Sequence, residues 1–132
     1  MSENNNLWVF VETKEDGSAM NVGLELMNPG RKMADALKKQ LVAVIIGENV
    51  EKAREEVKKY GVDSIITVEG ETYKDYNTDI YTNALCKLVE KYSPNVILIG
   101  ATMNGRDLGP RVSSRLGTCL LYTSDAADDT PC

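Results

Sequence analysis

The residues best able to do chemistry in this chain gather in one stretch, which reads IGATMNGRDLGPR and ends at Arg111. Gly100 lets the backbone leave a strand sharply, and Gly105 permits a positive φ angle. Asp107 is placed to cap the first free N–H groups of a helix. Those N–H groups, together with the guanidinium groups of Arg106 and Arg111, could attract an anion or a carboxylate. The pattern is also explained by a tight turn whose arginines pair with surface acids, and the residues alone leave both interpretations open.

Catalytic and metal-binding chemistry has little support elsewhere in the chain. The sequence contains no histidine, so Ser113, Ser114 and Cys86 lack the usual general base for nucleophilic catalysis. The cysteines show no CxxC spacing that would indicate a zinc site or a disulfide framework. Neither GxGxxG nor GxxxxGK followed by Ser or Thr comes after the first apolar run, so no phosphate cradle is expected there. We predict no catalytic residue and no metal site.

Composition places the chain among single-domain globular proteins. Its 132 residues suffice for one domain, and 42% of them are hydrophobic and 27% charged. The net charge of -5, with lysines and arginines mixed among glutamates, argues against a nucleic-acid partner. No segment reaches the roughly 20 apolar residues of a membrane span, and no signal peptide is visible. We therefore expect no membrane insertion and a reducing location in the bacterial cytoplasm.

The apolar pattern changes period repeatedly, which is typical of alternating strands and helices. Four apolar runs predict strands at Leu7–Val11, Leu41–Ile46, Ser64–Val68 and Val96–Ile99. Segments with helical signals follow these strands at Leu24–Lys39, Glu51–Tyr60, Thr78–Tyr92 and Asp107–Leu116. Strands that are almost wholly apolar are covered on both faces, which predicts a parallel sheet between two helical layers. The expected fold class is therefore a three-layer α/β/α fold with a doubly wound parallel sheet in strand order 3-2-1-4.

Local signals at the helix ends leave one boundary open. Pro29 follows Asn28 and could be a first-turn proline capped by that asparagine, or it could kink a helix that begins near Val22. For the next helix the signals are simpler, since Asn49 is expected to cap its start and Gly61 to stop it.

The predicted strand order also indicates where to look for a ligand. In that order the winding reverses between the first and fourth strands, and a crevice opens outside their carboxyl ends. The loops Thr13–Ser18 and Ala101–Asp107 would flank this crevice. A bound ligand or a partner group is expected there first.

The glycine- and arginine-containing stretch belongs to a longer pattern. From Gly100 to Thr118 the chain reads GATxxGRDLGPRxxxRLxT, and Cys119 stands where a glycine would follow. This segment closely resembles the end of the N-terminal domain of the alpha subunit in electron-transfer flavoproteins. Further agreement, in family order, is found at Val9–Glu12, Leu24–Leu26, Arg31–Asp35, Val44–Gly47, Tyr76–Thr78 and Pro94–Val96. The resemblance covers residues 7–118.

The resemblance implies an adenine-nucleotide-hydrolase-like fold within a heterodimeric flavoprotein. Such a protein takes electrons from acyl-CoA or other dehydrogenases, as in fatty acid β-oxidation, and passes them to a membrane quinone reductase or another acceptor. Its FAD would be held mainly by a C-terminal domain of the alpha subunit that this chain lacks, so no cofactor is expected on the fragment itself. The domain would act as a scaffold and as an interface with the beta subunit.

The resemblance also indicates which residues would make contacts. Those that could still touch a cofactor are Gly100, Ala101, Thr102, Gly105, Arg106 and Asp107. Those expected at the interface with the beta subunit are Arg106, Leu108, Gly109, Pro110 and Arg111.

A stand-alone nucleotide-binding module of the universal-stress type is the alternative, because the order of strands and helices fits both classes. That module would place a glycine-rich loop with serines or threonines after the fourth strand. The sequence from Gly105 to Pro110 fits such a loop poorly.

The character of the sequence changes from Cys119 onward. Residues Cys119–Asp128, which read CLLYTSDAAD, resemble one reading frame of the transposon adapter used in sequencing libraries. We therefore expect the native domain to span residues 1–118, with residues 119–132 a non-native tail and a fifth strand of the sheet lost. A natural polar C-terminal tail is the alternative interpretation.

Overall fold

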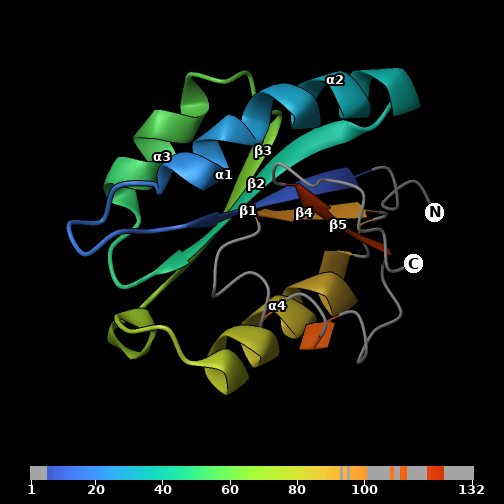
Figure 1. Ribbon diagram of the computed structural model, residues 1–132. Helices are drawn as coiled ribbons and strands as arrows, with labels where there is room; N and C mark the ends of the chain where they lie inside the picture. The colour runs from blue at the N-terminus through green and yellow to red at the C-terminus, as the bar shows by residue number, and fades with distance from the viewer. Residues whose placement is uncertain are drawn as a thin grey trace.

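A computed structural model describes residues 6–92, 94, 96–100, 108, 111–112 and 119–123 of the chain. It contains a parallel sheet with the strand order β3-β2-β1-β4-β5, and helices cover both faces of this sheet (Figure 1). The strands are β1 Asn6–Glu12, β2 Gln40–Gly47, β3 Ser64–Glu69, β4 Val96–Gly100 and β5 Cys119–Thr123. The predicted three-layer fold and the strand order 3-2-1-4 are confirmed.

The fifth strand is a correction to the sequence analysis, which expected it to be lost. Residues Cys119–Thr123 pair in parallel with Val96–Gly100 along the whole of β4. Without this strand β4 would present a free row of backbone N–H and C=O groups at the sheet edge. The run CLLYT, with its apolar and aromatic residues, has the strand preference that such an edge requires.

The helices form the two outer layers. The helices α1 Asn21–Glu25, α2 Met27–Leu37 and α3 Glu51–Lys58 cover one face of the sheet, and α4 Thr78–Tyr92 covers the other (Figure 1). A short 3-10 helix, η2 Glu71–Tyr73, lies in the link between β3 and α4. Leu108 and Val112 are also helical, and both are buried in the core that α4 shares with the sheet.

The helical region after β1 is divided at Leu26, which resolves the open boundary. Pro29 lies in the first turn of α2, where it lacks the N–H that would reach back to the carbonyl of Glu25, the last residue of α1. Of the two alternatives, the early start near Val22 is confirmed because α1 begins at Asn21. The capping role of Asn28 is wrong, since Leu26 is the N-cap residue of α2 and no side chain caps this helix.

The alternation of side chains along β1 divides the core into two halves. Trp8 and Phe10 point to the layer of α4, whereas Val9 and Val11 point to the layer of α1, α2 and α3. All four side chains are no more than 2% exposed, as expected for a central parallel strand. Cys86 lies in the same core as Trp8, which confirms its prediction as a packing residue.

Candidate functional site

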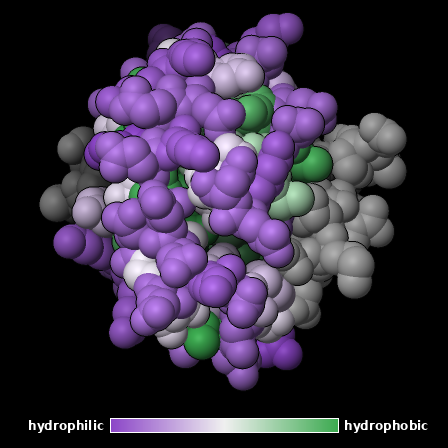
Figure 2. Space-filling model, turned by 90° about the vertical axis from the view of Figure 1, so that its left-hand side faces the viewer, coloured by the Kyte–Doolittle hydropathy of each residue, from purple (hydrophilic) through white to green (hydrophobic). Residues whose placement is uncertain are grey.

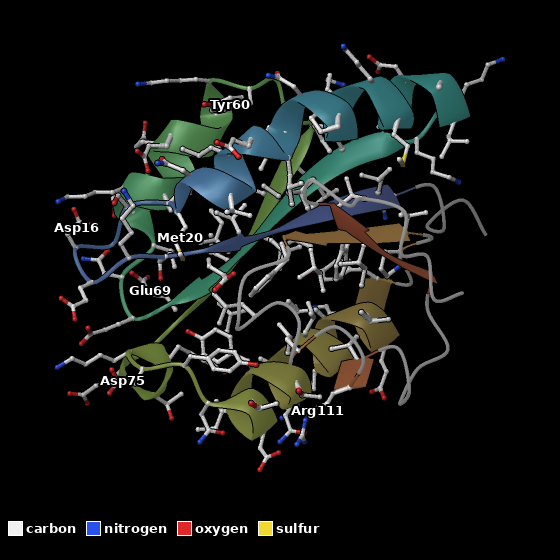
Figure 3. The ribbon with its side chains drawn as sticks, viewed as in Figure 1. Asp16, Met20, Tyr60, Glu69, Asp75 and Arg111 are labelled. Atoms are coloured by element: carbon white, nitrogen blue, oxygen red, sulfur yellow. The ribbon has the colours of Figure 1, made fainter. Side chains whose placement is uncertain are left out.

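A polar hollow opens at the carboxyl edge of the sheet, where the chain leaves β1, β2 and β3. Figure 2 looks onto this side of the molecule, whose surface is mainly hydrophilic. The hollow has a volume of about 320 Å³, and the residues that line it are Thr13, Lys14, Glu15, Gly17, Glu48, Asn49, Lys74 and Asp75. Figure 3 shows Asp16, Glu69 and Asp75 on the same side of the molecule. The carboxyl edge of a parallel sheet is where ligands and partners most often bind.

The first wall of the hollow is a tight hairpin formed by residues 12–20, which we call the β1–α1 hairpin. Thr13 and Ala19 form an antiparallel bridge, and the N–H of Lys14 donates to the carbonyl of Ser18 at 2.8 Å. At the tip, Asp16 Oδ1 accepts hydrogen bonds from the N–H of Ser18 at 3.0 Å and from its hydroxyl at 2.6 Å. These two bonds favour the charged carboxylate and lower the pKa of Asp16. The tip is thereby fixed although it is exposed.

The β1–α1 hairpin is fastened to α3 by hydrogen bonds of its own. The N–H of Ala19 donates to Glu56 Oε1 at 2.7 Å, and the N–H of Ala53 donates to the carbonyl of Gly17 at 3.2 Å. Gly17 has a φ of +88°, and a Cβ atom there would lie 2.9 Å from the carbonyl oxygen of Asn49. Only glycine satisfies both conditions, so this contact requires glycine at the position.

The second wall is the turn between β2 and α3. Asn49 Oδ1 accepts the N–H of Glu51 at 3.2 Å, and Glu69 Oε2 accepts the N–H of Val50 at 3.3 Å. The N-cap residue is Val50 and its side chain makes no capping bond, but the side chain of Asn49 still satisfies the first N–H of the helix. The prediction of Asn49 as the N-cap residue is therefore wrong by one position, although its side chain does accept an N–H at the start of the helix.

The third wall, which carries Lys74 and Asp75, is positioned by a cluster of three tyrosines. The hydroxyl of Tyr81 in α4 donates to the carbonyl of Tyr73 at 2.8 Å, and their ring centroids lie 5.7 Å apart. The rings of Tyr76 and Tyr81 are 5.0 Å apart. Burial raises the pKa of Tyr81 to about 12, so this hydroxyl stays protonated near neutral pH. It therefore acts as a structural donor rather than as an acid or base.

The charges around the hollow are mixed. Lys14 and Lys74 bring two ammonium groups, and Glu15, Glu48 and Asp75 bring three carboxylates. All five side chains are exposed. Within the described part of the chain, no hydrogen bond or ion pair engages any of the three carboxylates.

The hollow is bordered by one of the two loops predicted to flank a ligand site, Thr13–Ser18, and its other walls follow β2 and β3. The second predicted loop, Ala101–Asp107, lies outside the described residues, so the crevice expected between β1 and β4 stays a prediction. Of the candidate cofactor contacts only Gly100 is described, and Ala101, Thr102, Gly105, Arg106 and Asp107 lie outside the described residues, as do Gly109 and Pro110. The hollow was not predicted because its walls are polar turns, whose residues follow no periodic pattern.

Gly100 is required for a reason that the sequence did not reveal. A Cβ atom at this position would overlap Cγ1 of Val22, since α1 packs directly against the end of β4. The next residue of α1 also lies close to the sheet, because a Cβ on Gly23 would lie 3.3 Å from the Cα of Val11 in β1. Close packing of α1 therefore demands a glycine at Gly100.

Two of the predicted interface residues are described. The side chain of Leu108 is fully buried and contributes to the domain's own core. Arg111 is 55% exposed, and its guanidinium lies 3.2 Å from the carboxylate of Asp79 in the first turn of α4. This pair links the helix that contains Arg111 to α4, and its exposure keeps its contribution to stability small.

The lining of this hollow does not fit FAD. The hollow is bordered by lysines and carboxylates, with no aromatic or aliphatic wall to cover a flavin ring. Its three carboxylates would also repel the pyrophosphate of the cofactor. No group of three or more potential metal ligands occurs among the described side chains. Within the same residues, no helix combines the length and the apolar character that a bilayer crossing requires.

Comparison with protein families gives a match over most of the chain. The family model described as "ETF: Electron transfer flavoprotein domain" matches residues 7–127. The electron transfer flavoprotein subunit alpha of Clostridium acetobutylicum is 39% identical over 92% of this chain and 36% of its own length. The acryloyl-CoA reductase electron transfer subunit beta of Anaerotignum propionicum is 45% identical over 86% of this chain and 31% of its length. Protein FixB of Clostridium saccharobutylicum is 38% identical over 92% of this chain and 36% of its length.

The chain spans about a third of the length of the curated relatives it matches.

Among solved structures, the N,N'-diacetylchitobiose deacetylase of Pyrococcus horikoshii is similar in fold. The superposition covers 89% of this chain and 60% of the deacetylase chain, with a TM-score of 0.56 and 11% sequence identity. A deacetylase of teicoplanin biosynthesis covers 91% of this chain and 68% of its own, with a TM-score of 0.57 and 8% identity. At such low identity these two structures show a shared fold and nothing more.

Proposed function

Because this chain belongs to the electron transfer flavoprotein domain family, we propose that it is the N-terminal domain of an alpha subunit in a heterodimeric electron transfer flavoprotein. The observation that carries the proposal is the match to alpha subunits from several bacteria over about nine-tenths of the chain. Proteins of this family carry electrons and are not catalysts. The complete protein would take electrons from a dehydrogenase and deliver them to a quinone reductase or another acceptor.

In this proposal the domain is a scaffold. Its sheet is buried on both faces at β1 and β2, and its carboxyl edge carries polar turns that do not suit a flavin. The FAD of the complete protein would therefore be held mainly by another domain of the alpha subunit. The name of the Anaerotignum propionicum relative links that protein to acryloyl-CoA reductase, which favours an acyl-CoA class of dehydrogenase as the electron donor here.

The contact with the beta subunit is proposed for the segment that contains Arg106, Gly109, Pro110 and Arg111. Leu108 of the same segment was also expected at this interface, but its side chain is fully buried in the domain's own core and cannot take part. The proposal comes from the resemblance of this segment to the family, and the exposure of Arg111 is compatible with it.

Co-expression tests the proposal. The complete alpha subunit that contains this domain is produced with its beta subunit, and co-purification and flavin absorbance are measured. We expect a yellow heterodimer, with Arg106→Glu or Gly105→Val weakening its assembly more than the thermal stability of the domain. Lys59→Glu, at the exposed end of α3, is the matched charge-reversal control. Equal losses of assembly and of stability would argue against an interface role for the segment.

A binding test on the chain of 132 residues addresses the alternative class. We expect neither FAD nor ATP to bind tightly. Tight ATP binding would favour a stand-alone nucleotide-binding module, which the family match does not favour.

A further inference from the structure

We propose that the outer edge of β3 binds the same strand of a second copy of this chain, so that two domains join through antiparallel β3 strands into one continuous sheet. β3 is an outer strand of the sheet, because it pairs with β2 alone, and β5 is the outer strand at the opposite side. This inference concerns the chain itself and does not depend on the proposed function.

The outer edge of β3 is accessible. A strand at the edge of a sheet presents a row of backbone N–H and C=O groups that lack a partner strand. Within the described part of the chain, the backbone of Ser64–Glu69 makes hydrogen bonds with β2 and with no other strand or turn. None of the residues of β3 is buried, whereas the middle of β1 is buried throughout. The edge is therefore open to another chain.

The sequence of β3 lacks the features that usually keep an edge strand from pairing with another chain. Such features are lysine or proline on the edge, bulges, and very short strands. β3 reads SIITVE, contains neither lysine nor proline, and pairs with β2 over all six residues without a bulge. The run Ile65–Val68 consists of β-branched residues, which have a high strand preference. Such an edge is suited to accept an added strand.

The side chains of β3 fit the strand to its own copy. A two-fold axis that passes through Ile66, perpendicular to the sheet, would place Ile66 opposite Ile66 of the copy and Ile65 opposite Thr67. Residues opposite each other in an antiparallel pair lie on the same face of the sheet. This register obeys that condition, because Ile66 and Val68 pack toward α4 whereas Ile65 packs toward the layer of α1, α2 and α3. Pairs of β-branched side chains across two strands stabilise a sheet.

The two acids at the ends of this run are engaged within their own domain. The pairing would bring Asp63 of one copy opposite Glu69 of the other, where two free carboxylates would repel each other. Asp63 Oδ2 lies 3.2 Å from the guanidinium of Arg31 and accepts the N–H of Leu41 at 2.8 Å. Glu69 Oε2 accepts the N–H of Val50 at 3.3 Å, at the positive N-terminal end of α3. Each charge is thus compensated inside its own domain, and the edge stays compatible with a copy of itself.

Sedimentation velocity of the 132-residue chain in reducing buffer, over a range of concentrations, tests the inference. One pair of edge strands buries less than the roughly 1,200–2,000 Å² of a stable interface, so we expect a weak dimer with a Kd of about 10–100 µM. Ile66→Lys places two ammonium groups opposite each other, and Thr67→Lys adds a cation at an exposed position of the edge. Each should raise Kd at least about five-fold. Asn28→Lys, at an exposed position of α2, is the matched control and should change Kd less than about two-fold.

A disulfide cross-link tests the register. In a chain with Cys119→Ser and Cys132→Ser, the buried Cys86 is the only remaining cysteine. Directly opposite residues of an antiparallel pair have Cβ atoms about 4.5–5.5 Å apart, so Ile66→Cys in this background should form a linked dimer on mild oxidation. Thr72→Cys, at an exposed position outside the strand, should cross-link at least about ten-fold more slowly.

Thermal unfolding verifies that each variant folds, and the exposed Thr67→Lys decides the test if Ile66→Lys does not. A wild-type chain that stays monomeric well above the expected Kd overturns the inference. So does a dimer that Thr67→Lys leaves as tight as Asn28→Lys does, because it would use another surface. A dimer in which Ile66→Cys cross-links no faster than Thr72→Cys overturns the proposed pairing as well.

Discussion

A single methyl group at the end of β4 tests how tightly α1 is packed. In Gly100→Ala the new Cβ would overlap Cγ1 of Val22. Non-bonded carbon atoms need about 3.5–4 Å between them, so Val22 must leave its rotamer or α1 must shift. Gly23 of α1 also lies close to the backbone of Val11 in the neighbouring strand β1, so α1 is packed tightly against both strands. Relief of the overlap therefore requires a change in this packing.

The expected magnitude follows from measured costs of overpacking. Gly100→Ala should lower the free energy of unfolding by about 1–3 kcal/mol. Val22→Ala removes two methyl groups from a half-buried site and should cost about 1 kcal/mol. The double variant should cost less than the sum of the two, with a coupling of about 1–2 kcal/mol, because the smaller Val22 replacement makes room for the new methyl group.

Urea unfolding of the 132-residue chain, followed by circular dichroism, measures all three variants. Gly70→Ala is the matched control, since Gly70 has an extended φ of 169° and its added Cβ would lie 3.6 Å from a ring atom of Tyr73, an ordinary van der Waals contact. This control should change stability by less than about 0.5 kcal/mol. If Gly100→Ala costs no more than Gly70→Ala, or if the cycle with Val22→Ala is additive, the close packing of α1 against β4 is refuted.

Three further predictions concern other parts of the chain. Burial raises the pKa of Tyr81 from 10.0 to about 12, so the folded state holds this proton more tightly than the unfolded state does. The free energy of unfolding should therefore fall as pH rises from about 10 to 12. Urea titrations at several pH values should show a smaller fall for Tyr81→Phe. Arg31→Met removes a guanidinium that donates to the carbonyl of Gly61 at 2.7 Å, and it should cost about 1 kcal/mol by thermal unfolding, against less than about half of that for the exposed Lys32→Met. Re-sequencing of the source DNA should continue through a glycine codon at Cys119 into a longer frame, and a genomic frame that encodes the present C-terminus and then stops would contradict the adapter origin.

Much of the fold could be predicted because burial leaves a direct trace in the sequence. A parallel strand covered on both faces must be apolar at nearly every position, as in Leu41–Ile46. The long helix Thr78–Tyr92 was predicted with the bounds that the structure has, because its apolar stripe is regular and its start and end carry clear polar and proline signals. Gly61 has the positive φ of +76° that is expected of a glycine beyond a helix end, but α3 ends at Lys58, two residues before the predicted end at Tyr60.

The misplaced boundaries have a different origin. Asn28 carries the local signal for a helix cap, but the helical region begins earlier, at Asn21. Pro29 is associated with the break between α1 and α2 at Leu26. Competition between two local signals is decided by packing against the sheet, which a short window of sequence does not contain. The strand at Cys119–Thr123 shows the same limit, since it forms where β4 offers a free edge.

The candidate site was the feature that the sequence predicted least well. Its walls bring together Gly17, Glu48 and Asp75, which are far apart in the chain and share no motif. Hydrogen bonds over long separations, such as the one between Ala19 and Glu56, hold these walls, and no periodic pattern encodes them.

The sequence by itself therefore determined the layers of this protein, the order of its strands and the family to which it belongs. Those properties depend on apolar periodicity and on a local motif, both of which are written along the chain. Only the tertiary structure decided that glycine is needed at Gly100 and that free carboxylates converge beside the β1–α1 hairpin. These properties depend on which turns meet at the carboxyl edge of the sheet, and that meeting is set by the packing of segments distant in sequence.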